Sequence, residues 1–160
     1  MMTDQQFTPL AQRYMDTIFR LAFHYTKSQA EADDITQEVL FKLYRADKEF
    51  ESEDHVKYWL LRVTINACKK VLLSPWRRTE PIENHTAAIP FPSPEHSELM
   101  DAVLALPANY RIPIYLHYYE DYSCNEVAAL LHIPGATVRT RLRRARAMLK
   151  TDLQEAENDV

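Results

Sequence analysis

Six cationic side chains and no acidic ones stand in one short stretch near the end of the chain, LLHIPGATVRTRLRRARAMLK. Arginine and lysine bind phosphate, and arginine can also grip guanine through two hydrogen bonds. Six fully used phosphate contacts would give a slope of about −5 in log affinity against log salt. A merely solvated helix would usually interleave glutamates in i,i+4 pairs. We therefore interpret the segment as a nucleic-acid-binding helix, whose cations are Arg139, Arg141, Arg143, Arg144, Arg146 and Lys150.

The basic segment divides into three arcs when successive residues are set about 100° apart on a helix. The apolar arc is predicted to face inward and holds Val138, Leu142, Ala145 and Leu149. One flank carries the cations Arg139, Arg143, Arg146 and Lys150. The far side, which a DNA groove would meet, is predicted to carry Thr137, Thr140, Arg141 and Arg144.

A short helix is predicted directly before the basic one. Ser123 and Glu126 have the capping-box spacing at its head, and the run VAALL follows. The turn HIPGA, which contains the chain's only glycine, Gly135, then leads into the basic helix. Two short helices joined by a tight turn, the second one basic, are typical of a helix-turn-helix DNA reader.

The segment DHVKYWLLRVTINACKKVLL, in the first half of the chain, predicts an amphipathic helix with two different faces. Its apolar arc holds Leu60, Leu61, Ala67, Cys68, Val71 and Leu72. The opposite face combines a ring for stacking, an amide for base edges and cations for phosphate, which suits single-stranded nucleic acid. Periodicity alone slightly favours the alternative, a helix whose polar face is merely solvated. The residues of that face are Trp59, Arg62, Asn66, Lys69 and Lys70.

Another predicted helix, QAEADDITQEVLFKLYRA, begins after the capping-box pair Ser28 and Glu31. Its inward arc holds Ile35, Val39, Leu40 and Leu43. A large aromatic stands among acids on the solvent side, which suits a partner that is both apolar and basic. That face is made of Asp34, Gln37, Glu38 and Phe41.

Five of the nine prolines fall between residues 75 and 94, which predicts a linker between two helical modules. We therefore expect an all-α fold with two small modules and a proline-rich linker, the C-terminal module being a helix-turn-helix. The predicted helix starts include Thr8-Pro9 in the first module and Ser93-Pro94 before the second. The predicted boundaries are 1–76, 77–94 and 95–160.

The chain of 160 residues has a formal charge of −4, so its positive charge is local. The six histidines are scattered, and Cys68 and Cys124 lack metal-ligand spacing. With no catalytic constellation visible, we expect neither an enzyme nor a metal or other cofactor. No stretch approaches the roughly 18 apolar residues of a membrane span, and the N-terminus MMTDQQFTPLAQRYMD has no targeting pattern. We expect a cytoplasmic protein with no membrane insertion of its own.

Together these motifs resemble the extracytoplasmic-function (ECF) sigma factors, the small two-module initiation subunits of bacterial RNA polymerase. DDITQEVLFKLYR is similar to the family's core-polymerase-binding helix. YWLLRVTINACKK followed by SPWRR is similar to its promoter-melting helix, and NEVAALLHIPGATVRTRLRRARAML to its promoter-reading helix-turn-helix. The resemblance implies a protein that binds core RNA polymerase and directs promoter-specific transcription initiation. Module 1–76 would bind polymerase and melt the minus-ten element, and module 95–160 would read the minus-thirty-five element.

The resemblance also implies roles for single residues. The polymerase-binding residues would be Asp34, Gln37, Glu38 and Phe41. The minus-ten DNA would meet Phe50, Arg62, Asn66, Lys69 and Lys70, with Phe50 and Asn66 lining the pocket for a flipped base. The minus-thirty-five DNA would meet Thr137, Arg139, Thr140, Arg143 and Arg144. The implied partners are core RNA polymerase, promoter DNA and an anti-sigma factor of the kind that holds many members inactive.

Three residues depart from the family pattern. Lys70 stands where many members have Asp, His132 stands at a turn position that is often Gly, and Pro134 replaces the usual Ser or Thr cap. A left-handed conformation at His132 is uncommon but tolerable. Two alternatives remain: a helix-turn-helix regulator that acts without polymerase, which would leave the Phe41 face unused, and a helical interaction protein with no nucleic-acid role, which would leave the basic helix unexplained.

Overall fold

The computed structural model describes residues 1–74 and 97–158. These residues form helices and short connections, with no β-strand among them. The chain divides into two compact units, Met1–Ala87 and Ala88–Val160. The expected all-α fold of two helical modules is thereby confirmed. The linker predicted at 77–94 lies outside the described residues, so the three module boundaries stay a prediction.

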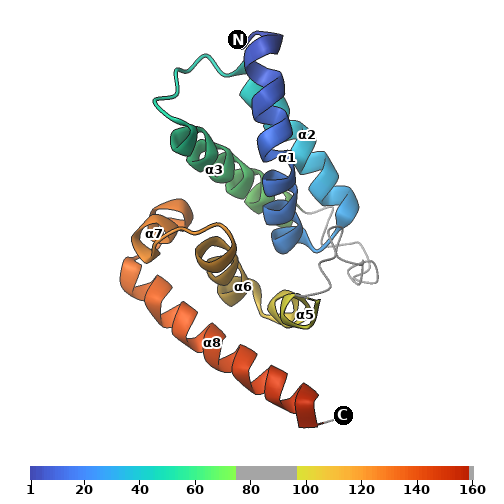
Figure 1. Ribbon diagram of the computed structural model, residues 1–160, viewed down its shortest axis with the longest axis vertical. Helices are drawn as coiled ribbons and strands as arrows, with labels where there is room; N and C mark the ends of the chain where they lie inside the picture. Colours follow the sequence, from blue (N-terminus) through green and yellow to red (C-terminus); the bar gives the residue numbers. More distant parts are fainter. Residues whose placement is uncertain (75–96, 159–160) are drawn as a thin grey trace. The chain divides into compact units, whose positions relative to one another are not determined.

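The first unit consists of α1 (Asp4–Thr26), α2 (Gln29–Arg45) and α3 (Glu53–Leu72), each packed on the other two (Figure 1). Two residues join α1 to α2, so the two helices run antiparallel as neighbours. The predicted inward positions of α2 and of the middle of α3 are buried, whereas Leu40, Val71 and Leu72 are half-buried. The largest fully buried side chains of this unit are Ile18, Leu21, Ile35, Leu43, Leu60, Leu61 and Ile65.

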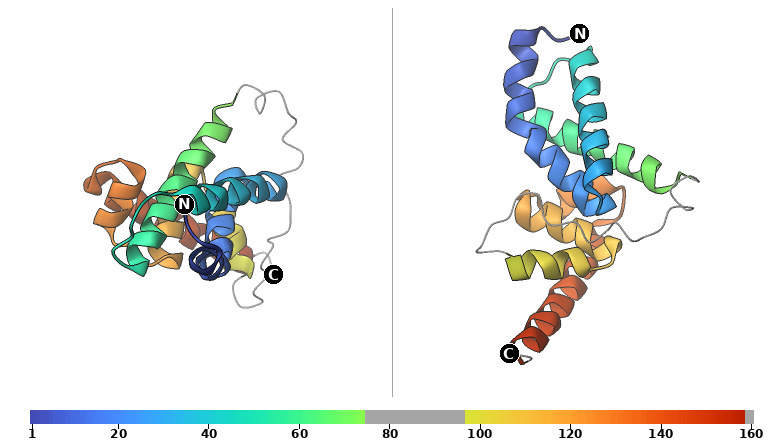
Figure 2. Two further views of the ribbon diagram at one scale, coloured as in Figure 1. Left: turned by 90° about the horizontal axis from the view of Figure 1, so that it is seen from above. Right: turned by 90° about the vertical axis from the view of Figure 1, so that its right-hand side faces the viewer.

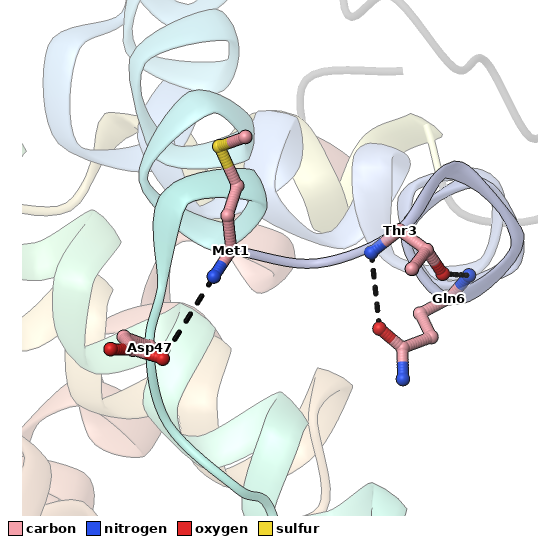
Figure 3. A network of polar contacts seen from close by, with 4 residues as sticks. All are labelled: Met1, Thr3, Gln6 and Asp47. Atoms are coloured by element: carbon pink, nitrogen blue, oxygen red, sulfur yellow. Dashed lines mark hydrogen bonds and ion pairs between the residues drawn. The ribbon is translucent and has the colours of Figure 1, made fainter.

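The start of α1 differs from the prediction of Thr8-Pro9, which was wrong. Thr3 is the N-cap: its hydroxyl accepts a hydrogen bond from the Gln6 N–H, and the Gln6 side chain accepts one from the Thr3 N–H (Figure 3). Two backbone donors that a helix start leaves unpaired are thus satisfied reciprocally, so the helix begins at Asp4 and includes Pro9. The terminal amino group of Met1 lies 3.8 Å from a carboxylate oxygen of Asp47, and Figure 3 draws this ion pair as a dashed line.

The second unit is built around the long helix α8 (Gly135–Asn158). α5 (Ser97–Ala105), α6 (Ala108–Ile114) and α7 (Cys124–Leu131) all pack against it (Figures 1 and 2). The inward arc predicted for the basic helix is confirmed, because all four of its apolar residues are buried. The start predicted for the helix before Pro107, at Ser93-Pro94, lies outside the described residues. The four buried residues are Val138, Leu142, Ala145 and Leu149.

A π-helical turn, η2 (Tyr115–Tyr119), directly follows α6. The Tyr115 and Tyr119 rings stack with their centroids 5.8 Å apart. The Tyr115 hydroxyl donates to a Glu120 carboxylate oxygen at 2.9 Å. The Tyr119 hydroxyl, in contrast, is buried without a hydrogen-bond partner in the described part of the chain. Burial raises the pKa of Tyr119.

Tyr119→Phe is expected to raise the free energy of unfolding by about 1 kcal/mol, because the hydroxyl loses water on folding and gains no partner. The folded state also holds the Tyr119 proton more tightly than the unfolded chain does, since its pKa is raised from 10.0. Wild-type stability should therefore fall as the pH rises above that value, and less so in the variant. The variant should still lose some stability at high pH, because the pKa of Tyr14 is also raised, by burial and by Glu53.

Urea unfolding near neutral pH and at a pH just above the ordinary pKa of tyrosine measures both effects. Tyr115→Phe is the matched control, because it removes a hydroxyl of the same turn, and that hydroxyl is hydrogen-bonded to Glu120. It should be less stable than wild type at neutral pH. Destabilisation of Tyr119→Phe at neutral pH would show instead that its hydroxyl is satisfied in solution.

Candidate nucleic-acid and polymerase interfaces

The helix-turn-helix is fixed by local hydrogen bonds. Ser123 and Glu126 form the predicted capping box at the head of α7. His132 ends α7 in the left-handed conformation, with φ 55° and ψ 44°, which is uncommon but tolerable for this residue. The Pro134 carbonyl then accepts hydrogen bonds from the N–H groups of Thr137 and Val138, in the first turn of α8. A proline side chain cannot accept hydrogen bonds from the first amides of α8, which leaves these amides for phosphate or for water.

The cations of α8 are available to a partner. Among the described residues, none of the six lies within ion-pair distance of a carboxylate. Of the five predicted contact residues, three arginines are exposed, and Thr137 and Thr140 are half-buried. Arg141, predicted on the far side, is also half-buried, because it lies close to the apolar arc on the helix. The exposed cations are Arg139, Arg143, Arg144, Arg146 and Lys150.

One polar contact of the basic helix was not predicted. Arg146 Nη1 donates a hydrogen bond to the Tyr118 hydroxyl oxygen at 2.9 Å, which joins α8 to η2. The two residues are 28 positions apart, so no local pattern could have paired them.

The polar face of α3 forms a continuous ridge. Its first four members follow one another at spacings of three and four residues, and Lys70 stands four residues after Asn66. All five lie on the side of the helix opposite the buried arc. Asn66, Lys69 and Lys70 are exposed, while Trp59 and Arg62 are half-buried. The ridge therefore presents an amide between cations, as the sequence predicts.

Phe50 lies in the connection between α2 and α3 and is half-buried. Its ring meets His55 and Trp59 edge-on, with centroids 5.3 Å and 5.5 Å away. The Glu51 N–H donates to His55 Nδ1 at 3.1 Å, which ties the connection to the first turn of α3. Trp59 precedes Asn66 by two helical turns, or about 10 Å along the axis. The pocket for a flipped base that Phe50 and Asn66 would line stays a prediction.

The acidic face of α2 is exposed at all four predicted positions. Phe41 has 56% of its surface exposed although its ring is large and apolar. The Arg45 guanidinium lies over that ring, 5.4 Å from the centroid. Glu38 pairs with Lys42 at 3.3 Å. Asp34 and Gln37 complete the face.

No group of three or more His, Cys, Asp or Glu residues in 1–74 and 97–158 is arranged to hold a metal ion. No helix in these ranges is both long and apolar enough to cross a membrane.

Residues 10–78 match the family Sigma-70 region 2, and residues 96–149 match the family Sigma-70, region 4. The chain is 30% identical to the RNA polymerase sigma-H factor of Pseudomonas aeruginosa, with 92% of this chain and 86% of that protein covered. It is 30% identical to the ECF RNA polymerase sigma-E factor of Haemophilus influenzae, with 92% and 87% covered.

Solved structures agree on the fold. The sigma factor RpoE of Bartonella quintana, in complex with the anti-sigma factor NepR, superposes with a TM-score of 0.76 at 21% identity, covering 94% of this chain and 98% of that one. CnrH, in complex with the cytosolic domain of CnrY, superposes with a TM-score of 0.67 at 21% identity, covering 96% and 90%. With both regions matched in order along one small chain, the protein belongs to the extracytoplasmic-function sigma factors, a family of transcription initiation factors.

Proposed function

We propose that this chain binds core RNA polymerase through the acidic face of α2, holds melted minus-ten DNA along the ridge of α3 and reads minus-thirty-five DNA with α8. The observation that carries the proposal is the set of cations on α8, none of which has a carboxylate partner among the described residues. In a chain of net charge −4, six cations concentrated on one helix without an acidic partner in the described ranges suit a polyanion. Membership of the family supports the same division of labour.

The proposal excludes covalent chemistry by the chain itself, because positioning polymerase and trapping a melted strand require binding alone. It places the protein in the cytoplasm, where bacterial RNA polymerase works. The module boundaries 1–76 and 95–160 belong to the proposal as well. The Bartonella relative was solved with an anti-sigma factor, and we propose a partner of that class for this chain.

Transcription in vitro tests the function. Core polymerase free of sigma factor is incubated with a pool of genomic fragments, with and without the full chain, and the RNA starts are sequenced. We expect new starts that share two spaced upstream elements. An absence of new starts, with the purified chain still binding DNA, would favour a helix-turn-helix regulator that acts without polymerase.

Arg143→Ala is expected to weaken closed-complex binding and to make the slope of log affinity against log salt shallower by about one, because one phosphate contact is lost. Arg143 is exposed on the cationic flank of α8. Titration of labelled promoter DNA at several salt concentrations measures both quantities. Arg20→Ala, which removes an exposed arginine from α1, is the control and should leave the slope unchanged. An unchanged slope in Arg143→Ala would remove this side chain from the DNA contacts.

A further inference from the structure

The contact between Tyr118 and Arg146 lies at the surface, where a tyrosine hydroxyl would ordinarily be hydrated. Tyr118 is 49% exposed, and Arg146 is exposed as well. The Arg146 guanidinium nevertheless donates to the Tyr118 hydroxyl oxygen at 2.9 Å. Among the described residues, Arg146 has no carboxylate within ion-pair distance. The hydrogen bond to Tyr118 therefore holds the Arg146 guanidinium in place, and no carboxylate among the described residues offsets its positive charge.

The turn that carries Tyr118 is held on both sides. Behind it, the buried Tyr115 stacks on Tyr119 and bonds Glu120. Beside it, His117 Nδ1 lies 2.7 Å from the Tyr122 carbonyl oxygen, so Nδ1 must carry the proton and donate it. The His117 ring meets the Tyr118 ring edge-on, with centroids 4.8 Å apart. Tyr118 is thus positioned before any ligand arrives.

The hydrogen-bonding capacity of the pair points toward an anion. Because the Tyr118 oxygen accepts from Arg146, its own O–H remains to be donated. Arg146 has further N–H groups, and it stands in the same row of α8 as Arg139, Arg143 and Lys150. That row lies at the edge of the helix face opposite the buried arc. Side chains at the edges of a reading helix meet the DNA backbone, while those at its centre meet bases.

We propose that Tyr118 and Arg146 together form a binding site for one phosphate of the DNA backbone. Tyr118 donates its O–H to the phosphate and also holds the Arg146 guanidinium against it. The site rests on the DNA-reading role proposed for α8 and adds to it a contact from outside the helix-turn-helix.

Methylphosphonate substitution, which replaces one charged phosphate with a neutral group, locates the site. The full chain first selects a duplex from a random pool without polymerase, and single methylphosphonates are then placed along that duplex. One position should lower wild-type affinity by about three- to tenfold, the loss of one or two hydrogen bonds. The same substitution should cost Tyr118→Phe less than it costs the wild type, because one of the two side-chain contacts is already gone, and it should have no further effect on Arg146→Ala.

The unmodified duplex supplies a second readout. Tyr118→Phe should bind about three- to tenfold more weakly with its salt slope unchanged, because no charge is removed. Arg146→Ala should bind more weakly still, with a slope shallower by about one. The double variant should bind no more weakly than Arg146→Ala, because the tyrosine acts through the same phosphate. Asn109→Ala, which truncates an exposed side chain of α6, is the control and should keep the wild-type methylphosphonate pattern.

Two results would overturn the site. One is wild-type affinity for the duplex in Tyr118→Phe. The other is a double variant that binds more weakly than Arg146→Ala by the full factor that Tyr118→Phe costs in the wild type. Transcription with core polymerase is measured separately. If the wild type directs initiation but no phosphate is shared by the two side chains, only this site is lost. If the wild type selects no duplex at all, the site and the DNA-reading role of α8 are overturned together.

Discussion

Asn66→Ala should lower open-complex formation by about ten- to a hundredfold, while affinity for core polymerase stays unchanged. Asn66 is exposed in the middle of the α3 ridge, between cations that would hold the backbone of a melted strand. Its amide can bond the edge of an unstacked base, a contact worth about 1–3 kcal/mol. That contact exists only after the strands separate, so its loss should affect opening and spare the closed complex. Permanganate reactivity of unpaired thymines measures the opening.

The matched control for this variant is Asn109→Ala, which truncates an exposed asparagine on α6 in the other unit. It should open promoters as the wild type does. Lys69→Ala gives a useful contrast, because losing a backbone contact should weaken binding to all sequences alike and make the salt slope shallower. Wild-type permanganate reactivity in Asn66→Ala would show that the ridge is only a solvated helix face, the interpretation that periodicity alone slightly favours.

The helix faces could be predicted from the sequence because burial follows the helical period. Ile35, Val39 and Leu43 of α2, like the apolar arc of α8, are buried where the wheel places them. The capping box at Ser123 is equally local, since donor and acceptor stand three residues apart. Such features depend on backbone geometry within one or two turns, and tertiary packing does not alter them.

Contacts between elements could not be predicted in the same way. The bond from Arg146 to Tyr118 depends on how η2 packs against α8, and nothing in either segment encodes that distance. The contact of Phe50 with Trp59 depends on the path of the connection between α2 and α3. The face of α3 was therefore predictable as a list of residues, but the packing of Phe50 against Trp59 was not.

Phe41→Ala should weaken binding to core polymerase by about thirtyfold or more, because a central exposed aromatic in an interface commonly contributes 2 kcal/mol or more. With 56% of Phe41 exposed, its removal should change the free energy of unfolding by less than about 0.5 kcal/mol. Titration of labelled chain with core polymerase measures the affinity, and urea unfolding measures the stability. Met15→Ala, which truncates a side chain 46% exposed on α1, is the control and should preserve both.

Arg45→Ala separates the ring from the cation that covers it. The Arg45 guanidinium lies over the Phe41 ring, so a basic partner surface must either displace it or meet it with like charge. If the ring itself is buried by polymerase, removing Arg45 should preserve or raise the affinity while Phe41→Ala lowers it. An equal loss in both variants would mean that the ring and the cation bind as one unit. Wild-type affinity in Phe41→Ala would exclude this face of α2 from the polymerase interface.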